Sequence, residues 1–329
     1  MNSMAEKHQY SNLNLWQRFR LTLLHGLFYG LSLLPLWVHY ILSDILFFII
    51  YYLIRYRRHI VKKNLAASFP EKSEAERHSI ERDFYHWFCD YLGETIKLTS
   101  ITPEELKRHM KFENTELLNR LVNEGKSVIL MVGHYCNWEW LSSVPLHVDV
   151  QEPDWYPMQV YHPLENPVVD TLFLDIRSRM GVHNISMRNT LRTMVSAQQR
   201  GVPCVAGFIA DQVPLWEAIH VWINFLSHPE TPFFTGGERI AKRLNYAMVY
   251  IDPRRERRGY YVATFRLMTE NPSDFPDYQL TEQYAHLLEE TILRQPAYWL
   301  WTHNRWKRTR EEYNKRMKNI IPKSNALQE

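Results

Sequence analysis

The chain has 329 residues, enough for one large domain or two, and its formal net charge is only +3. This balance gives no support to nucleic-acid binding, which calls for a strongly basic surface. Aromatic residues make up 14% of the chain, a composition compatible with contact to a membrane interface. The three widely spaced cysteines indicate a reducing compartment and match no disulfide framework or metal motif: Cys89, Cys136 and Cys204.

A long apolar tract occupies residues 21–54 and is divided by Pro35. Its second part, Leu36–Ile54, is close to the length needed to cross a bilayer. Asp44 lies inside it and would be costly at the centre of a lone spanning helix. Two interpretations stay open: a membrane anchor, spanning or re-entrant, or a hydrophobic hairpin that lies on the surface or packs on the core.

A basic run follows the apolar tract directly. Positive charge beside an apolar segment favours the cytoplasmic side of a membrane and anionic lipid, and the alternative is a solvated helix end. The run consists of Arg55, Arg57, Arg58, Lys62 and Lys63.

The rest of the chain alternates between helical and strand patterns. Ser73 and Glu76 form a capping box before an aromatic stripe with helical spacing, and residues 103–124 hold further helix. This alternation predicts an α/β domain with a largely parallel sheet. The expected strands are 128–132, 155–161, 202–210, 247–251 and 260–267, and the later helices are 168–180, 190–200, 236–244 and 281–294.

The chain is organised around residues 127–143, SVILMVGHYCNWEWLSS. Its apolar run reads as a buried strand that Gly133 ends, and Asn137 is placed to cap a helix that begins near Trp138. His134 is therefore expected on the loop at the carboxyl end of the strand, with Glu139 in the first turn of the helix. Open α/β sheets bind ligands at this edge.

A histidine followed five positions later by an acid is a weak pattern, and four copies occur in this chain. One lies in the apolar tract, one on the capped helix and one in a loop without a strong strand before it. Only one spans a strand end and a helix start, so its context selects it. The copies are His39/Asp44, His78/Asp83, His134/Glu139 and His147/Glu152.

This setting suits the activation of a hydroxyl group. A neutral imidazole takes the proton as the oxygen attacks, and a carboxylate on the other ring nitrogen fixes the tautomer. An acyl thioester as donor would need no enzyme nucleophile. Two alternatives stay open: a structural loop histidine that caps a helix, and a Cys136–His134 pair that forms an acyl-enzyme.

Several blocks together resemble a known family. GHYCNWEW resembles the G-H-x-G-N-W-E block of the lipid A late (secondary) acyltransferases, of lauroyl and myristoyl type, and RYRRHIVKKNLAASFPEKSEAER is similar to their upstream R-x-x-N-L-x-x-x-F-P-E segment. VYHPLENPVVDTLFLDIRSRMG, IADQVP and PAYWLWTHNRWK follow in the family's order, the last two as its D-Q and Q-Y-x-W-x-H-x-R-F-K blocks. The likeness covers roughly residues 15–310.

The resemblance implies an αβα sandwich of the glycerolipid-acyltransferase type with an N-terminal hydrophobic helical anchor. It assigns residues 1–56 to the anchor and 57–329 to an acyltransferase catalytic domain that faces the cytoplasm at the inner membrane. The reaction it implies is acyl transfer, without cofactor or metal, from a thioester of acyl carrier protein or coenzyme A to a hydroxyl of a lipid A precursor. Related members acylate other glycolipids.

The resemblance also implies roles for single residues. His134 is the general base and Glu139 its partner, while Arg177 matches the family arginine proposed to steady the developing oxyanion. Arg179 is a nearby second candidate for contact with the substrate. The alternative for Arg177 is a structural ion pair, for instance with an aspartate.

Three further residues are expected at the substrate. Asp211 and Gln212 follow a strand and are predicted to form a wall of the site, and the alternative is a turn or a helix cap. Asn137 is predicted to bind substrate. Two basic stretches, 254–258 and 305–318, are candidates for contact with phosphates or an acidic carrier, against the alternative of solvated loops.

The sequence departs from the family pattern at two places. Cys136 stands where the family has glycine, and Leu226-Ser227 follows Phe225 where another glycine is expected. These departures bear on the acceptor and the chain length more than on the reaction type. A non-catalytic lipid-binding or assembly protein of the same fold is a further alternative, and the intact His134 and Glu139 argue against it.

Overall fold

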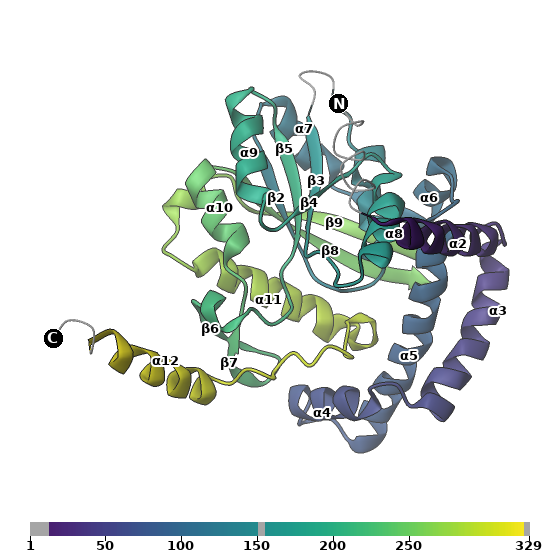
Figure 1. The fold of residues 1–329 in the computed structure, drawn as a ribbon. Coiled ribbons are helices and arrows are strands. Elements are labelled where there is room, and N and C mark those ends of the chain that lie inside the picture. Colours follow the sequence, from purple (N-terminus) through teal and green to yellow (C-terminus); the bar gives the residue numbers. More distant parts are fainter. Residues whose placement is uncertain (1–12, 151–154, 326–329) are drawn as a thin grey trace.

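A computed structural model describes residues 13–150 and 155–325, with side chains up to residue 318. Its centre is a seven-stranded sheet of order β1-β9-β8-β2-β5-β3-β4 (Figure 1). All neighbouring strands run parallel except β8 and β9, which confirms the predicted α/β class with a largely parallel sheet. The strands are β1 Met110–Glu113, β2 Val128–Val132, β3 Tyr156–Tyr161, β4 His183–Ser186, β5 Cys204–Ile209, β8 Ala247–Arg257 and β9 Tyr260–Thr269.

Strand β2 lies in the middle of this sheet and is buried at every position. A continuous run of valine, isoleucine, leucine and methionine is what a strand covered on both faces requires. The predicted strand 128–132 is therefore confirmed. Its central place puts the residues that follow it between the ends of neighbouring strands.

Helices surround the sheet. The predicted capping box is present at the start of α5, where the Ser73 hydroxyl accepts from the Glu76 amide and the Glu76 carboxylate accepts from the Ser73 amide. The longer helices are α2 Leu15–Ser32, α3 Leu36–Phe47, α4 Arg58–Ser68, α5 Glu74–Lys97, α8 Pro167–Ser178, α9 Thr190–Gln199, α10 Gly236–Leu244, α11 Gln279–Arg294 and α12 Arg310–Asn325. The shorter α6 is Pro103–His109, α7 is Thr115–Asn123 and the π-helix η1, directly after α3, is Phe48–Ile54.

Several short elements differ from the prediction. The expected helix over 103–124 is interrupted by β1, and β4 was not expected. A hairpin of β6, Trp222–Phe225, and β7, His228–Pro232, lies between β5 and α10 and was not expected either. The strand expected over 247–251 is longer than predicted, because β8 continues to Arg257 in antiparallel register with β9. β1, β4, β6 and β7 have only four or five residues each, and the end of β8 is rich in charge. Local hydrophobic patterns therefore do not predict these strand segments.

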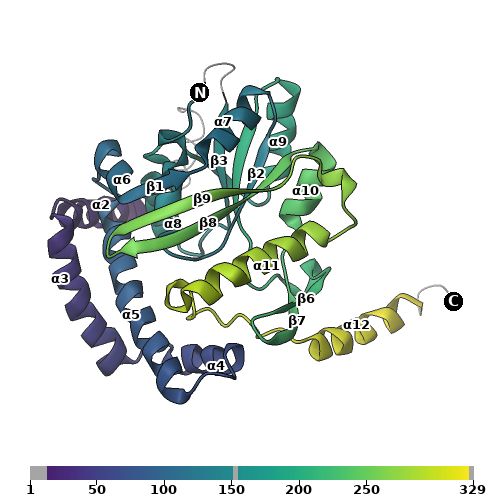
Figure 2. The ribbon, with the colours of Figure 1, turned by 180° about the vertical axis from the view of Figure 1, so that it is seen from behind.

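The apolar tract forms two helices, α2 and α3, that pack on other helices of the domain and not on each other: α2 lies against α8 and α5, and α3 lies against α5. Pro35 caps α3, as its dividing position predicted. Figures 1 and 2 show α3 running alongside α5 at one side of the sheet, while α12 projects from the other side. His39 and Ser43 are buried against α5, and the Ser43 hydroxyl donates to the Cys89 carbonyl at 3.0 Å. Asp44 is paired with Arg258 at 2.6 Å, so its charge is compensated from the β8–β9 hairpin.

The outer sides of these helices are uncovered in the described structure. The segment Leu36–Ile54 is long and apolar enough to cross a membrane, and it is the one described helix that meets this test of length and composition. One side of α3 packs on α5 and makes polar contacts with it. The other side of α3 is apolar and exposed in the described structure. Exposed large apolar residues on α2, α3 and η1 include Leu15, Trp16, Phe19, Leu23, Leu27, Trp37, Ile41, Ile45, Phe48, Leu53 and Ile54.

Candidate active site

Two parallel strands bring His134 and Asp211 together at the carboxyl edge of the sheet. Strands β2 and β5 pair in register from Val128↔Val205 to Val132↔Ile209, so the residues two positions further along also face each other. His134 Nδ1 lies 2.6 Å from Asp211 Oδ1, and the His134 amide donates to Oδ2 at 2.9 Å. Gly133 lets α11 pack closely against this edge of the sheet, since a Cβ there would come within 2.6 Å of Leu288 Cδ1.

Asp211 is a buried carboxylate with a full set of donors. Its side chain is 2% exposed, whereas that of His134 is 19% exposed. The Trp299 indole donates to Oδ2 at 2.7 Å. Burial by itself would raise the pKa of Asp211, but the His134 ring and amide and the Trp299 indole outweigh it and hold the pKa at about 2. Asp211 is therefore an anion that fixes one ring nitrogen of His134.

Glu139 has a different partner. Both of its oxygens accept from Arg177, from Nε at 2.6 Å and from Nη2 at 2.5 Å, in a bidentate pair. Burial acts to lower the pKa of Arg177, but Glu139 more than offsets this and the pKa is raised. The predicted His134–Glu139 contact is thus corrected: the carboxylate on the histidine ring is Asp211. An ion pair was the alternative weighed for Arg177, and its partner is Glu139.

Aromatic rings connect the two pairs. The Trp138 ring lies 5.1 Å from the His134 ring and 4.2 Å from the Tyr91 ring, measured between centroids. The Tyr91 hydroxyl contacts Glu139 Oε1 at 3.5 Å. The aromatic stripe predicted on helix α5 therefore packs against residues of the site through Tyr91.

The loop after β2 is a tight turn in place of the expected helix start. Asn137 Oδ1 accepts from the Trp140 amide at 3.1 Å, and a 3₁₀ helix, η2, spans Trp140–Leu146. Asn137 is thus not the N-cap residue that was expected: that position is Glu139, and the Asn137 side chain instead closes the turn before the 3₁₀ helix. Asn137 is 1% exposed and its amide nitrogen donates to Glu94. Its described contacts are with the protein interior, in contrast to the predicted substrate contact.

Of the two other residues predicted to contact substrate, Gln212 lies at the site and Arg179 does not. Gln212 Nε2 lies 3.3 Å from His134 Nε2, beside the ring nitrogen that Asp211 leaves free. Arg179 instead donates to the backbone carbonyls of Leu98 and Ile101, after the end of α5. Arg179 thus ties α8 to α5, although it is only two residues from Arg177.

Cys136 does not meet the requirements of a nucleophile. It is 1% exposed, and burial raises the pKa of its thiol well above the usual value. Because the thiolate is the reactive form, this alternative loses its support. The residue has φ of 51°, in the left-handed region that glycine adopts without strain, which explains why a glycine suits this position. Leu226 and Ser227, at φ 50° and 59°, form the tight β6–β7 turn and lie in the same left-handed region. A glycine would therefore suit this turn as well.

The C-terminal block holds the site loop through its backbone. The Leu300 amide donates to the His134 carbonyl at 3.1 Å, and the Cys136 amide donates to the Tyr298 carbonyl at 2.9 Å. Trp299 lies between them and bonds Asp211. Sequence reasoning missed Trp299 as a contributor, although it belongs to a block that the resemblance had singled out.

The basic stretch 254–258 is neither a solvated loop nor a free cationic patch. Arg254 pairs with Glu113 at 2.7 Å, and Arg255 and Arg258 both pair with the buried Asp90. The positive charges of these three arginines are paired with carboxylates of the domain. Three of the four arginines in the stretch are therefore already held, and contact of this stretch with phosphates stays a prediction.

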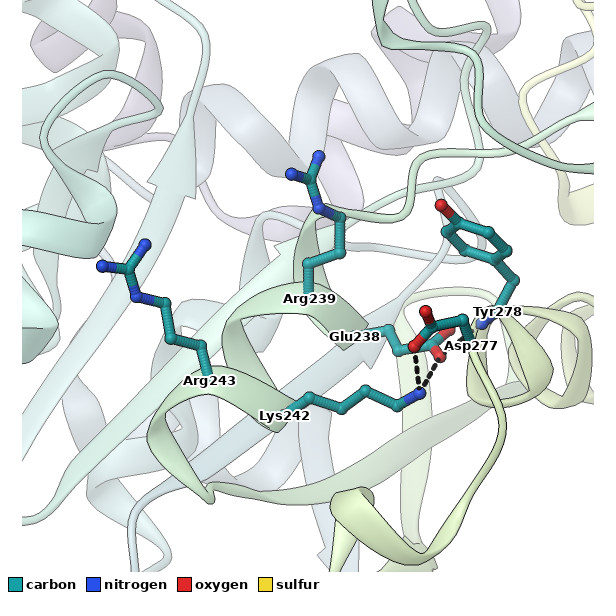
Figure 3. A pocket seen from close by; sticks show the side chains of 6 residues that line it. All are labelled: Glu238, Arg239, Lys242, Arg243, Asp277 and Tyr278. Atoms are coloured by element: carbon teal, nitrogen blue, oxygen red, sulfur yellow. Dashed lines mark hydrogen bonds and ion pairs between the residues drawn. The ribbon is translucent and has the colours of Figure 1, made fainter.

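Two surface hollows lie away from His134. One, of about 390 Å³, borders α10 and the loop before α11; Figure 3 shows Lys242 there, bound to Glu238 and Asp277. The other, of about 450 Å³, follows one side of α2. Across the described residues, no group of three or more His, Cys, Asp or Glu side chains is placed to hold a metal ion.

The fold and this site define a class of protein. It is an α/β domain in which a buried aspartate holds a histidine ring at the carboxyl edge of the sheet. A glutamate on the loop after the same strand holds an arginine. Residues 6–308 match the model of the bacterial lipid A biosynthesis acyltransferases, and the chain belongs to this family.

Individual relatives are distant in sequence. The chain is 24% identical to the lipid A biosynthesis lauroyltransferase of Escherichia coli (strain K12), over 78% of this chain and 80% of that protein. It is 22% identical to lipid A biosynthesis acyltransferase 2 of Shigella flexneri and to the E. coli lipid A biosynthesis myristoyltransferase, over 42% of this chain in each case. These two matches span only 42% and 41% of the relatives' own lengths.

Proposed function

We propose that this protein transfers an acyl chain from an acyl thioester to a hydroxyl of a lipid A precursor, with His134 as general base. The observation that carries the proposal is the His134 ring, partly exposed and held through Nδ1 by the buried Asp211. Family membership supports the reaction class, and the sheet flanked by helices is compatible with the αβα fold of glycerolipid acyltransferases.

The first step is attack by the acceptor hydroxyl. With Nδ1–H donated to Asp211, His134 Nε2 carries a lone pair that faces the Gln212 amide at 3.3 Å. The acceptor hydroxyl displaces this amide and gives its proton to Nε2. The oxygen then bonds to the thioester carbonyl carbon, and the carbonyl becomes an oxyanion. Asp211 stabilises the resulting imidazolium without taking its proton.

The second step expels the thiol. The carbon–sulfur bond breaks as the oxyanion collapses, and His134 returns its proton to the sulfur. Arg177 is proposed to stabilise the oxyanion, because Glu139 accepts one N–H from Nε and one from Nη2, and the other three N–H groups of the guanidinium remain as donors. In this scheme Glu139 acts through Arg177 as a positioning residue, and Gln212 lines the site beside Nε2.

We further propose that the protein acts at the cytoplasmic face of the inner membrane. The apolar sides of α2, α3 and η1 would enter the bilayer interface while the other side of α3 stays on α5. The exposed cations Arg55, Lys62 and Lys63 follow this surface directly and suit anionic lipid. The proposed donor is acyl carrier protein, with coenzyme A as the alternative, and related glycolipids are alternative acceptors.

The test uses the full-length protein in phospholipid vesicles with a lipid A precursor and acyl carrier protein thioesters of several chain lengths, with coenzyme A thioesters in parallel. Ester product is measured by mass spectrometry. Wild type is expected to form one acyl ester per acceptor, and His134→Ala to lose about 10²–10⁴-fold in rate. A wild type that binds the lipid and forms no ester from any thioester would overturn the proposal in favour of a non-catalytic lipid-binding protein. Undiminished transfer by folded His134→Ala would overturn the mechanism.

A further inference from the structure

Glu94 is a fully buried carboxylate in the middle of three parts of the molecule. It lies on α5 at 0% exposure. Its Oε2 accepts from Asn137 Nδ2 at 2.7 Å and from the Tyr261 hydroxyl at 2.9 Å, and Oε1 accepts from the Tyr40 hydroxyl at 3.2 Å. A carboxylate buried at this depth is tolerated only because such donors satisfy it.

The first connection runs to the loop of the candidate site. Asn137, which donates to Glu94, also accepts from the Trp140 amide and so fixes the turn between His134 and Glu139. The Trp140 indole donates to the Glu94 backbone carbonyl at 3.2 Å. The turn is thus bound to Glu94 on both sides of Glu139.

The second connection runs to the apolar helix α3. Tyr40 belongs to α3, and its ring lies 4.7 Å from the Arg258 guanidinium. The tip of the β8–β9 turn comes close to the Tyr40 ring at Gly259, where a Cβ would clash with the Tyr40 hydroxyl. Tyr40 thus packs against this turn while its hydroxyl donates to Glu94.

We propose that Glu94 is a positioning residue that fixes the loop carrying His134 and Glu139 and links this loop to the apolar helix α3. The sheet, the loop and α3 each supply one donor to this carboxylate. The role rests on the proposed acyl transfer for its kinetic consequence, but the positioning itself is a property of the fold.

The hydrogen-bond pattern predicts which substitution Glu94 tolerates. Burial, followed by the charge of Asp90, raises the pKa of Glu94 to about 7, against the opposing effects of Arg255, Asn137 and Tyr261. A glutamine fits the same pattern: its oxygen accepts from Asn137 and Tyr261, and its amide donates to the Tyr40 oxygen. An alanine leaves all three donors buried without an acceptor.

The experiment measures kcat and KM for Glu94→Ala and Glu94→Gln in vesicles, with Glu238→Ala as matched control. Glu238 is also buried, at 2%, and accepts from the Tyr278 amide at 2.6 Å and the Thr281 amide at 2.9 Å, but it lies on α10 (Figure 3). We expect Glu94→Ala to lose about 10–100-fold in kcat with KM within about threefold, since small displacements of reacting groups have such effects. Glu94→Gln and Glu238→Ala should keep kcat within about threefold of wild type.

Hydrogen exchange of residues 133–140 is measured on the same proteins and does not depend on catalysis. Faster exchange there in Glu94→Ala, and not in Glu238→Ala, is expected. Unchanged exchange in folded Glu94→Ala, an equal kcat loss in Glu238→Ala, or no rescue by glutamine would each overturn the inference. If the alanine variant does not fold, Tyr40→Phe removes one donor and keeps the ring, and unchanged exchange of residues 133–140 in that variant would overturn the link to α3. An inactive wild type would overturn the proposed function alone, because the exchange result still decides this one.

Discussion

Two carboxylates lie at the same edge of the sheet and have opposite kinds of partner. Asp211 holds His134 at 2.6 Å, and Glu139 holds Arg177 at 2.5 and 2.6 Å. In each pair the acid is almost fully buried, at 2% and 4%, and the base is about one fifth exposed. The geometry is closely similar, so the chemical difference comes from the cation.

A histidine exists in neutral and charged forms near neutral pH, whereas an arginine is always charged. Asp211 therefore fixes a tautomer and leaves Nε2 free to accept a proton. Glu139 instead fixes a permanent positive charge in one orientation. One edge of the sheet thus offers a proton acceptor and a stationary cation, the two groups that acyl transfer to a hydroxyl needs.

The largest effect is expected from Asp211→Asn. The amide removes the anion from the ring and permits the wrong tautomer, so kcat should fall by about 10²–10⁴-fold. Steady-state acyl transfer in vesicles measures it, with Asp277→Asn as control, since Asp277 is exposed and pairs only with Lys242 in the described structure. A kcat within about threefold of wild type would refute the part assigned to Asp211.

The second effect concerns the Glu139–Arg177 pair. Arg177→Gln removes the cation proposed for the oxyanion and should lower kcat by about 10²-fold, with less change in KM. Arg243→Gln, an exposed arginine on α10, is the control (Figure 3). A rise in KM at constant kcat would instead indicate that Arg177 binds substrate in the ground state.

The third effect is on acid stability. Because the folded pKa of Asp211 is about 2, below its ordinary value of 3.8, its contribution is present above about pH 4 and is lost as pH falls towards 2. The free energy of unfolding of wild type should therefore lose about 2 kcal/mol more than that of Asp211→Asn over this range. Denaturant unfolding at several pH values measures the difference, and parallel pH profiles would contradict the pKa.

The smallest effect is expected from Cys136. Cys136→Ala should keep kcat within about threefold of wild type, because the buried thiol takes no part in the chemistry. Cys136→Gly should unfold at slightly higher temperature, since φ of 51° is unstrained for glycine. A thioester-linked intermediate that disappears in Cys136→Ala, together with a loss of activity, would restore the acyl-enzyme alternative.

Local chemistry in the sequence was sufficient for much of this fold. The strand 128–132, the division of the apolar tract at Pro35 and the capping box at Ser73 depend only on neighbouring residues, and all three are present. The strands β1 and β4 and the β6–β7 hairpin were missed because each is four or five residues long and only partly buried, without the continuous apolar run that marks the equally short β2.

Local patterns in the sequence could not identify the carboxylate that binds the His134 ring. Asp211 is 77 positions away and reaches the ring only because β5 lies next to β2 in register. Glu139, five residues from the histidine, was the nearer acid in sequence, but the turn directs it to Arg177 on α8. The acid at position 94 went unnoticed, although it lies three residues beyond Tyr91 on the apolar face of its helix, where a charge is unusual.

The state of the His134 ring tests the central claim most directly. Nitrogen-15 NMR of histidine-labelled protein at neutral pH reports which ring nitrogen carries the proton and whether that proton is hydrogen-bonded. We predict a hydrogen-bonded proton on Nδ1 in wild type and in Glu139→Gln, and its loss in Asp211→Asn. A proton on Nδ1 that persists in Asp211→Asn and disappears in Glu139→Gln would contradict the assignment of Asp211 as the carboxylate that orients the base.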